Sequence, residues 1–410
     1  MDRWVSSSRL RIAGLLVAPL GIVLVVVVLT PGPAFAGVTG DVGVFFGYAN
    51  RLLGGAIPYR GFPLEYPPLA LVPMSIPRLV WPFGTPTDDA FSLLFALMEG
   101  CLAVLVGSLI ARASADPMRA LATWAVLVLA AGASITWRYD LWPAALVLGA
   151  VVAVDRGRPG LAGVAIGVGT MLKLFPIVVL PILAARSLAL RDWAGLKRLV
   201  LGAAVTVALV MGVAFAAAGS DSLMWLTYEL DRGLQLESTG SGILLLLHVL
   251  ADQPFALVHA FGTLEVVAPG ADIVAPATTV IELLLVAAVG ACALVRFRRD
   301  ARRLGAVPLA SLAVAVVAVV VALIVSSKVF SAQYIVWFLP LIPFVPGRLR
   351  WMGLVIAAVS TVIYPLAYTP VWQLDPLMAL VLNARNVLLI LFLLWLGAWL
   401  LAREGPAART

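Results

Sequence analysis

Charged side chains, histidine and cysteine are all scarce in this chain, and each shortage excludes a class of protein. Only 12% of the 410 residues are charged, while 62% are hydrophobic. A soluble domain of this length could not bury so much apolar surface. Cys101 and Cys292 both lie within apolar runs, which favours small buried side chains over a disulfide or a metal pair. His248 and His259 have no partners at a metal-ligand spacing, so we expect no metal site.

The chain has instead a series of apolar runs, each roughly long enough to cross a bilayer as a helix of about 20 residues. Such a series predicts an all-α, polytopic membrane protein, forming one integral-membrane domain over residues 1–410. We expect about twelve transmembrane helices. They are placed at residues 12–29, 90–111, 120–137, 140–154, 160–174, 175–188, 199–218, 275–296, 305–325, 334–346, 352–369 and 380–401.

The distribution of lysine and arginine gives these helices a direction. Cytoplasmic loops carry more Lys and Arg than outer loops. With the N-terminus inside, all but eight of the 28 Lys and Arg residues fall in inner loops. We therefore expect a cell-membrane protein with both termini in the cytoplasm. The net charge of +7 is spread in small clusters, which fits loops facing anionic lipid and argues against a nucleic-acid partner.

The N-terminal run also resembles a secretory signal. Three arginines precede it, and residues 34–37 resemble a signal-peptidase site. The apolar run is longer than the usual core of a signal peptide, which favours a retained first helix. In either case Asp41 would lie on the outer face.

Two outer loops are large, at about residues 30–89 and 219–274. Within the first, Leu64–Phe83 is apolar but contains five prolines, which remove backbone donors and disfavour helix before them. Within the second, Ile243–Ala268 contains both histidines, two acids and a proline. We expect both stretches to form juxtamembrane helices at the outer membrane surface, not full spans.

The first outer loop concentrates the side chains that suggest an enzyme. Loops this long are usually functional or disordered, and the aromatics of this one argue against disorder. Asp41 is the leading catalytic candidate, because a carboxylate there can take a proton from a substrate hydroxyl as general base. The structural alternative is that Asp41 caps the helix predicted after it. Glu65 is the other acid, in a stiff Tyr-Pro-Pro context that is either structural or positions an acceptor.

Three outer cations lie in polar strings that contain glycine or serine: Lys173, Arg232 and Lys328. Ionisable residues at membrane depth are costly and usually functional. Three basic groups from distant segments could converge on one anion, and a lipid phosphate already lies at that depth. Arginine would bind phosphate through its fork and lysine as a point charge. The alternative is that each cation only extends to lipid headgroups. Asp140 is expected to pair with Arg138, two residues away.

Five strings, in this order, carry a family resemblance. They are Asp41 in the first outer loop, Pro58-Tyr59-Arg60-Gly61-Phe62 with Glu65-Tyr66-Pro67-Pro68, Lys173-Leu174-Phe175-Pro176, Arg232-Gly233-Leu234-Gln235-Leu236-Glu237-Ser238, and Ser327-Lys328-Val329-Phe330-Ser331-Ala332-Gln333-Tyr334. Together they resemble the actinobacterial polyprenol-phosphate-mannose-dependent mannosyltransferases, glycosyltransferase family 87 of the GT-C superfamily. Members often have an acid at the position of Gly61, so any role of that acid is unfilled here.

The resemblance implies a GT-C fold and a set of roles. Asp41 would be the catalytic base, and Lys173, Arg232 and Lys328 would bind the donor phosphate. Residues that would position substrate are Arg60, Glu65, Tyr66, Gln235, Glu237 and Gln333. The donor would be a polyprenyl-phosphate sugar, the acceptor a glycan or glycolipid, and no cofactor would be needed. Aromatic side chains of the same strings could stack on sugar, or could equally anchor the protein at the interface.

Three other functions compete with this one. A flippase for a lipid-linked sugar would share the basic outer cavity, but it needs inner access as well, and few acids lie within the spans to couple it to an ion. A scaffold protein would explain none of the five strings. An enzyme of the same fold that uses polyprenol-phosphate arabinose is compatible with every residue quoted.

Overall fold

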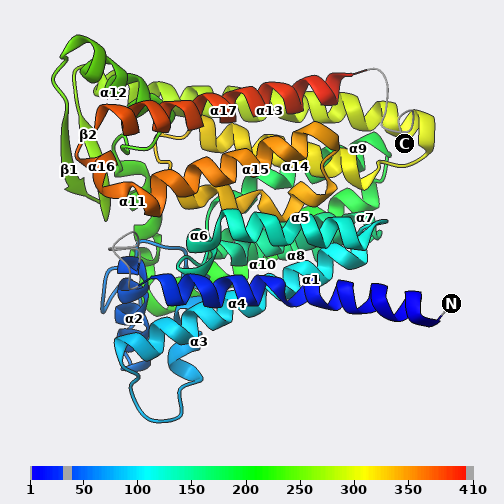
Figure 1. Cartoon of the computed structure of the whole chain (residues 1–410), viewed down its shortest axis with the longest axis horizontal. Coiled ribbons are helices and arrows are strands. Elements are labelled where there is room, and N and C mark those ends of the chain that lie inside the picture. The colour runs from blue at the N-terminus through cyan, green and yellow to red at the C-terminus, as the bar shows by residue number, and fades with distance from the viewer. Residues whose placement is uncertain (1, 31–38, 403–410) are drawn as a thin grey trace.

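The computed structural model describes residues 2–30 and 39–402, so the cleavage-like segment at residues 34–37 lies outside the described part. Nearly all regular structure is helical (Figure 1). Within the described residues, seven helices are long and apolar enough to cross a membrane. They are built on α1 (Asp2–Leu29), α4 (Asp88–Ala113), α10 (Trp193–Ala218), α13 (Ala271–Leu304), α14 (Leu309–Ser326), α15 (Gly347–Thr361) and α17 (Pro376–Leu401). The expected all-α, polytopic membrane protein is confirmed.

The other five expected spans fall on shorter helical segments. These are α5 (Pro117–Ala130) with α6 (Gly132–Thr136), α7 (Leu141–Asp155), α8 (Pro159–Leu172), η3 (Phe175–Val179) with α9 (Leu180–Ala189), and η5 (Ala332–Trp337) with η6 (Leu339–Phe344). Most of these lie inside the bundle beside α14, nearly all of whose residues are buried. A buried helix is covered by protein, so it needs no continuous apolar length of its own to face lipid.

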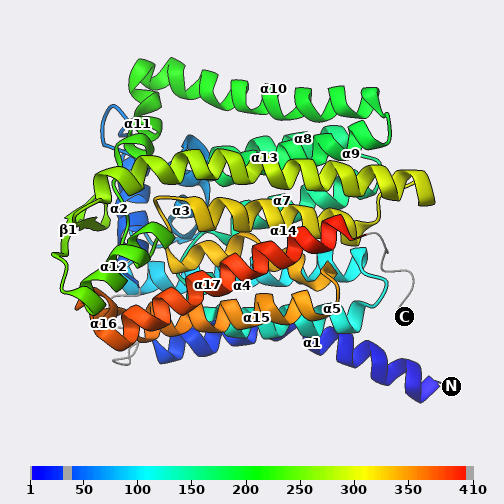
Figure 2. The same cartoon turned by 90° about the horizontal axis from the view of Figure 1, so that it is seen from above.

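One end of the bundle holds most of the short elements, and we call it the loop end (Figures 1 and 2, left). It comprises α2 (Gly40–Leu53), η2 (Pro68–Ala70), α3 (Leu71–Leu79), η4 (Gly219–Leu223), α11 (Met224–Asp231), α12 (Thr239–Ala251), β1 (Ala256–Ala260), β2 (Thr263–Val267), η7 (Val362–Leu366) and α16 (Tyr368–Trp372). The start of α1 and the end of α17 both lie at the opposite end, as expected for termini that share one membrane face.

The expectation of helices throughout Ile243–Ala268 is wrong for its second half. Helix α12 ends before Asp252, which has a left-handed φ of 50°. Residues 256–267 then form an antiparallel hairpin, with Ala256 opposite Val267. Its turn residues, Phe261 and Gly262, both have positive φ, at 48° and 65°. That is the backbone a two-residue hairpin turn requires, because it matches the twist of the strands. The first stretch, by contrast, does contain short helices, η2 and α3.

Small residues let α8 and α10 approach closely. A Cβ atom built on Gly163 would lie 2.0 Å from the Leu199 carbonyl oxygen and 2.9 Å from the Ala203 amide nitrogen. Neither backbone atom can move without shifting α10. Close backbone approach at small residues is the usual way in which membrane helices associate.

We expect Gly163→Ala to lower the free energy of unfolding by about 1–3 kcal/mol, the usual cost of overpacking a well-packed contact. Gly212→Ala, in α10, is the matched control, since a Cβ there meets nothing within 4 Å. Reversible unfolding in mixed detergent micelles measures both. Equal stability of the two variants would show that the α8–α10 contact is looser than described.

Candidate functional site

A cavity of about 510 Å³ lies at the loop end. Its walls come from α2, the first loop, the ends of α6 and α8, α11, the hairpin, the start of η5 and the segment from η7 to α16. Eight of the ten side chains predicted for the site line it: Asp41, Glu65, Tyr66, Lys173, Arg232, Gln235, Glu237 and Gln333. Arg60 and Lys328 are not among the lining residues; Arg60 is exposed on the loop.

Asp41 is the second residue of α2, in its first turn, where a negative charge is favoured by the helix dipole. The N-cap position belongs to Thr39, so Asp41 is not the capping residue that its sequence context allowed. The Asp41 Oδ2 atom lies 2.9 Å from the Arg138 Nε atom. The Asp41 side chain is 43% exposed, whereas that of Arg138 is 8% exposed. A buried guanidinium thus holds a carboxylate that still faces the cavity.

Arg138 is itself held by its neighbours. Its Nη1 donates to the Trp137 carbonyl oxygen at 3.0 Å, and its Nη2 donates to the Tyr364 hydroxyl. The guanidinium also lies 5.3 Å from the centre of the Tyr364 ring. These contacts leave the guanidinium few alternative positions, and the orientation of the Asp41 carboxylate follows from them.

Lys173 directly follows α8 and enters the cavity as part of an ion pair. Its Nζ lies 2.7 Å from Asp140 Oδ1, and the Trp337 indole N–H donates to the same oxygen at 2.6 Å. The Asp140 side chain is only 2% exposed. Its two partners therefore stabilise a buried charge that would otherwise be costly.

Aromatic rings surround the Lys173 ammonium. It lies 5.0–5.5 Å from the centres of the Tyr139, Tyr334 and Trp337 rings, within the range of cation–π attraction. The Trp337 ring stacks between Phe175 and Tyr334, with centroid distances of 4.2 and 4.0 Å. Lys173 is thereby fixed as a point charge at the cavity wall.

Arg232 and Lys328 come together, but only Arg232 lines the cavity. The Arg232 Nη1 atom lies 3.5 Å from Glu229 Oε1, and its guanidinium lies 5.9 Å from the centre of the Tyr228 ring. Lys328 Nζ donates to the Leu230 and Arg232 carbonyl oxygens at 2.8 and 2.6 Å. In the structure Lys328 therefore fixes the backbone that carries Arg232.

The string from Arg232 to Ser238 runs beside β2. The Leu236 amide donates to the Leu264 carbonyl oxygen, and the Val266 amide donates to the Leu234 carbonyl oxygen. The amide of Gly233 donates to Glu265 Oε1 at 2.8 Å, and a Cβ built on Gly233 would lie 2.6 Å from Glu265 Oε2. A side chain at Gly233 would therefore require the Glu265 carboxylate to move.

Gln235 and Glu237 reach the cavity from the same string. Gln235 Nε2 donates to the Ser331 hydroxyl at 2.6 Å, and its buried Oε1 has no hydrogen-bond partner among the described residues. The Glu237 Oε2 atom lies 3.6 Å from Arg385 Nη1, and Arg385 Nη2 donates to the backbone carbonyl oxygen of Glu237. Burial raises the pKa of Glu237, and the Arg385 charge opposes that shift.

Glu65 and Tyr66 face the hairpin turn across the cavity. The Tyr59 hydroxyl donates to the Tyr66 carbonyl oxygen at 2.8 Å, which fixes the loop in place. Burial, followed by the neighbouring Glu65 charge, raises the pKa of the Tyr66 phenol well above its ordinary value. Tyr66 therefore stays a neutral hydrogen-bond donor. A Cβ built on Gly262 would lie 3.7 Å from Glu65 Oε2, so the turn closes over this acid.

Besides Trp225, Tyr228 and Glu229 of α11, sequence reasoning missed two further parts of the wall. One is the hairpin, which contributes His259, Phe261 and its neighbours. The other is an aromatic set at residues 364–372, in which Tyr364, Tyr368 and Trp372 recur every four residues. That spacing was visible in the sequence, since residues four apart share a helix face. Within residues 2–30 and 39–402, no three His, Cys, Asp or Glu side chains are grouped so as to hold a metal ion.

The fold and the cavity define a multi-pass membrane protein with a charged, aromatic-lined site at one end of its helices. The model of glycosyltransferase family 87 matches residues 64–327, well over half of the chain. The chain therefore belongs to glycosyltransferase family 87 and is a membrane glycosyltransferase. No curated protein matches it. Asp41 and the aromatic set at residues 364–372 lie outside the matched range.

Proposed function

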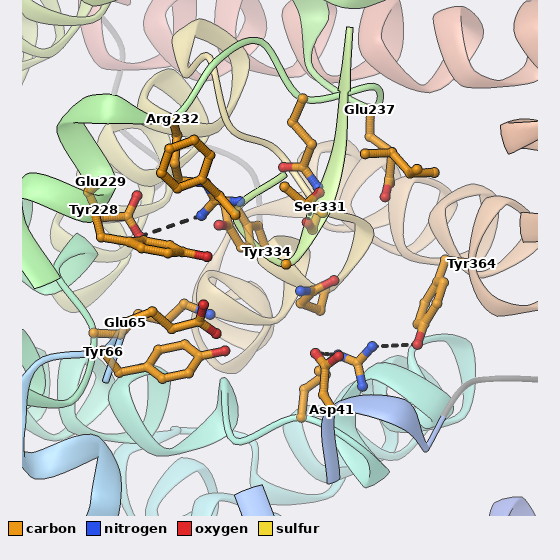
Figure 3. A pocket seen from close by; sticks show the side chains of 18 of the residues that line it. Asp41, Glu65, Tyr66, Tyr228, Glu229, Arg232, Glu237, Ser331, Tyr334 and Tyr364 are labelled. Carbon is orange, nitrogen blue, oxygen red and sulfur yellow. Dashed lines mark hydrogen bonds and ion pairs between the residues drawn. The ribbon is translucent and has the colours of Figure 1, made fainter. Parts of the chain in front are cut away.

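We propose that this enzyme transfers mannose from a polyprenyl-phosphate donor to a hydroxyl of a glycan or glycolipid acceptor, with inversion, at the outer face of the cell membrane. The observation that carries the proposal is the composition of one cavity. A half-exposed carboxylate, Asp41, shares that cavity with the cations Lys173 and Arg232. Figure 3 shows Asp41 on one side and Arg232 on another, with open space between them.

The base step uses Asp41. An acceptor hydroxyl placed against its free oxygen gives up its proton to the carboxylate as the hydroxyl oxygen attacks the anomeric carbon. The Arg138 contact orients the carboxylate but leaves it exposed to the cavity. A single displacement of this kind needs one base and forms no covalent enzyme intermediate, which is why it inverts the anomeric centre.

The leaving group departs on the cationic side. As the bond between the anomeric carbon and the phosphate oxygen breaks, the electron pair stays with the phosphate, which becomes a monoester with an additional negative charge. Arg232 and Lys173 stabilise that charge where it develops. The separation of Arg232 from Glu229, at 3.5 Å, is long for a charge-assisted hydrogen bond. A phosphate can therefore replace Glu229 as the partner of the guanidinium.

The decisive experiment is an assay of the purified protein in lipid nanodiscs with a panel of polyprenyl-phosphate sugars. The panel contains mannose and arabinose donors, with a mixture of alkyl glycosides as acceptors. We expect a new glycosidic bond from the mannose donor, of anomeric configuration opposite to that of the donor by NMR. A product from arabinose alone would reassign the donor. Movement of the donor across sealed vesicles without a new bond would contradict transfer and indicate a flippase.

A further inference from the structure

One wall of the cavity is aromatic and nearly uncharged, unlike the others. It is formed by η7 and α16, which contribute Tyr364, Tyr368, Thr369 and Trp372. These residues lie outside the family match, and the donor roles assigned above use none of them. We call Tyr364, Tyr368 and Trp372 the aromatic wall.

The local backbone points the aromatic wall toward the cavity. Tyr364 has an extended conformation, φ −139° and ψ 123°, at a kink that follows the end of α15. Such irregular turns often occur at functional sites, because they redirect a side chain that a regular helix would place elsewhere. The four-residue spacing in α16 then places Tyr368 and Trp372 on one helix face.

Contacts connect the aromatic wall to Asp41. The Tyr364 hydroxyl accepts from Arg138, the residue that holds the Asp41 carboxylate. The Tyr364 and Tyr368 rings meet edge to face at 5.1 Å, so Tyr368 packs directly on the residue that contacts Arg138. Figure 3 shows Tyr364 beside Asp41, on the side away from Arg232, Tyr228 and Glu229.

The proposed positions of the base and the phosphate determine whether the donor or the acceptor lies against the aromatic wall. The base must contact the acceptor hydroxyl, so the acceptor lies at the Asp41 side, while the phosphate lies with Lys173 and Arg232. An aromatic face with few charges suits the apolar C–H face of a pyranose ring, whose hydroxyls point outward to polar groups. Tyr364 is 9% exposed at the base of the wall, and Trp372 is 46% exposed at its rim.

We infer that the aromatic wall is the acceptor subsite: Tyr368 and Trp372 stack against the sugar ring that offers its hydroxyl to Asp41, and Tyr364 sets the depth of that ring through Arg138. The inference rests on the proposed function and names the part of the site that selects the acceptor. The acceptor class is a pyranose-bearing glycan, because the wall lies beside a carboxylate that faces the cavity and can take a proton from a sugar hydroxyl, which a neutral lipid surface does not offer.

The test separates acceptor affinity from donor affinity. Trp372→Ala and Tyr368→Ala are expected to raise the KM for octyl α-D-mannopyranoside about tenfold, roughly the loss of one good aromatic contact. The KM for polyprenyl-phosphate mannose should change less than twofold. Trp372→Phe, which keeps a ring, should restore most of the affinity. Trp351→Ala is the matched control, because Trp351 is 68% exposed in α15 and does not line the cavity.

A binding measurement keeps the inference testable without turnover. Saturation-transfer NMR on the wild-type protein and on Trp372→Ala, with octyl α-D-mannopyranoside alone, reports acceptor binding directly. Tenfold weaker binding by the variant supports the subsite even if no donor gives a product, in which case only the proposed function fails. An active enzyme whose acceptor KM is unchanged in both alanine variants overturns the subsite. Equal increases in donor and acceptor KM overturn it as well, because they indicate a structural role or an interface anchor.

Discussion

Asp41→Asn is expected to abolish sugar transfer while leaving donor binding intact. Asparagine has the size of aspartate but cannot accept the acceptor proton, and general-base catalysis of this kind contributes roughly 10²–10⁴-fold. The loss of kcat should be toward the upper end of that range, because the proposed mechanism has no second base. The donor phosphate lies with Arg232 and Lys173, so the affinity for the donor should change little.

The measurement is kcat under saturating donor and acceptor, together with donor binding by the same variant. Asp272→Asn is the control, because Asp272 is an exposed acid in the first turn of α13 at the loop end and does not line the cavity. It makes the same change of charge without touching the site. Full activity of Asp41→Asn would remove the carboxylate from the mechanism. Loss of donor binding along with activity would place Asp41 in the donor site instead.

The helices could be predicted from the sequence because a membrane imposes a length on them. A span needs about 20 apolar residues, and that requirement is visible as a run. All seven long helices begin and end within about a turn or two of the expected positions, apart from longer extensions of α1 and α13 beyond the bilayer-length core. The hairpin was not visible, because a short apolar run such as Ala256–Ala260 reads the same as buried helix. Only Gly262 marked its turn.

The convergence of the candidate site residues on one cavity could be predicted, but their ion-pair partners could not. The five strings brought eight predicted side chains to one cavity, since chemistry-bearing residues in an apolar chain are few. The partners are another matter. Asp41 pairs with Arg138 and Asp140 with Lys173, across 97 and 33 residues, and no local pattern encodes such contacts. Only tertiary packing decides them.

Lys328 illustrates the same limit at a single residue. Its string and its depth both suggested a phosphate ligand. In the structure its ammonium instead donates to two backbone carbonyls, those of Leu230 and Arg232. A lysine that binds the backbone and a lysine that binds phosphate have the same sequence context, because both need a cation beside a polar turn. Only the direction of the side chain separates them.

Arg232→Gln and Lys328→Met test whether Arg232 binds the donor phosphate while Lys328 holds the backbone of Arg232. The first variant should lose mainly catalysis, and the second mainly stability. Arg232→Gln removes a charge aimed at the leaving phosphate, and kcat/KM should fall about 10²-fold, the usual cost of one such electrostatic donor. The inhibition constant of free polyprenyl monophosphate against the Arg232→Gln variant should rise as well, because the phosphate loses the same partner. Lys328→Met leaves that charge in place but removes the hydrogen bonds to the Leu230 and Arg232 carbonyl oxygens. The free energy of unfolding should drop by about 1–3 kcal/mol, and kcat/KM should fall about tenfold.

The measurement is the inhibition constant of polyprenyl monophosphate for Arg232→Gln and for Lys328→Met, each relative to wild type. The free energy of unfolding of both variants is measured in detergent. Arg51→Gln is the control, since Arg51 is an exposed arginine at the loop end that does not line the cavity. If Lys328→Met weakens phosphate inhibition as strongly as Arg232→Gln, with no change in stability, Lys328 contacts the donor directly. If instead its inhibition constant stays near that of wild type while its stability falls, Lys328 acts by holding Arg232, and the donor phosphate rests on Arg232 and Lys173.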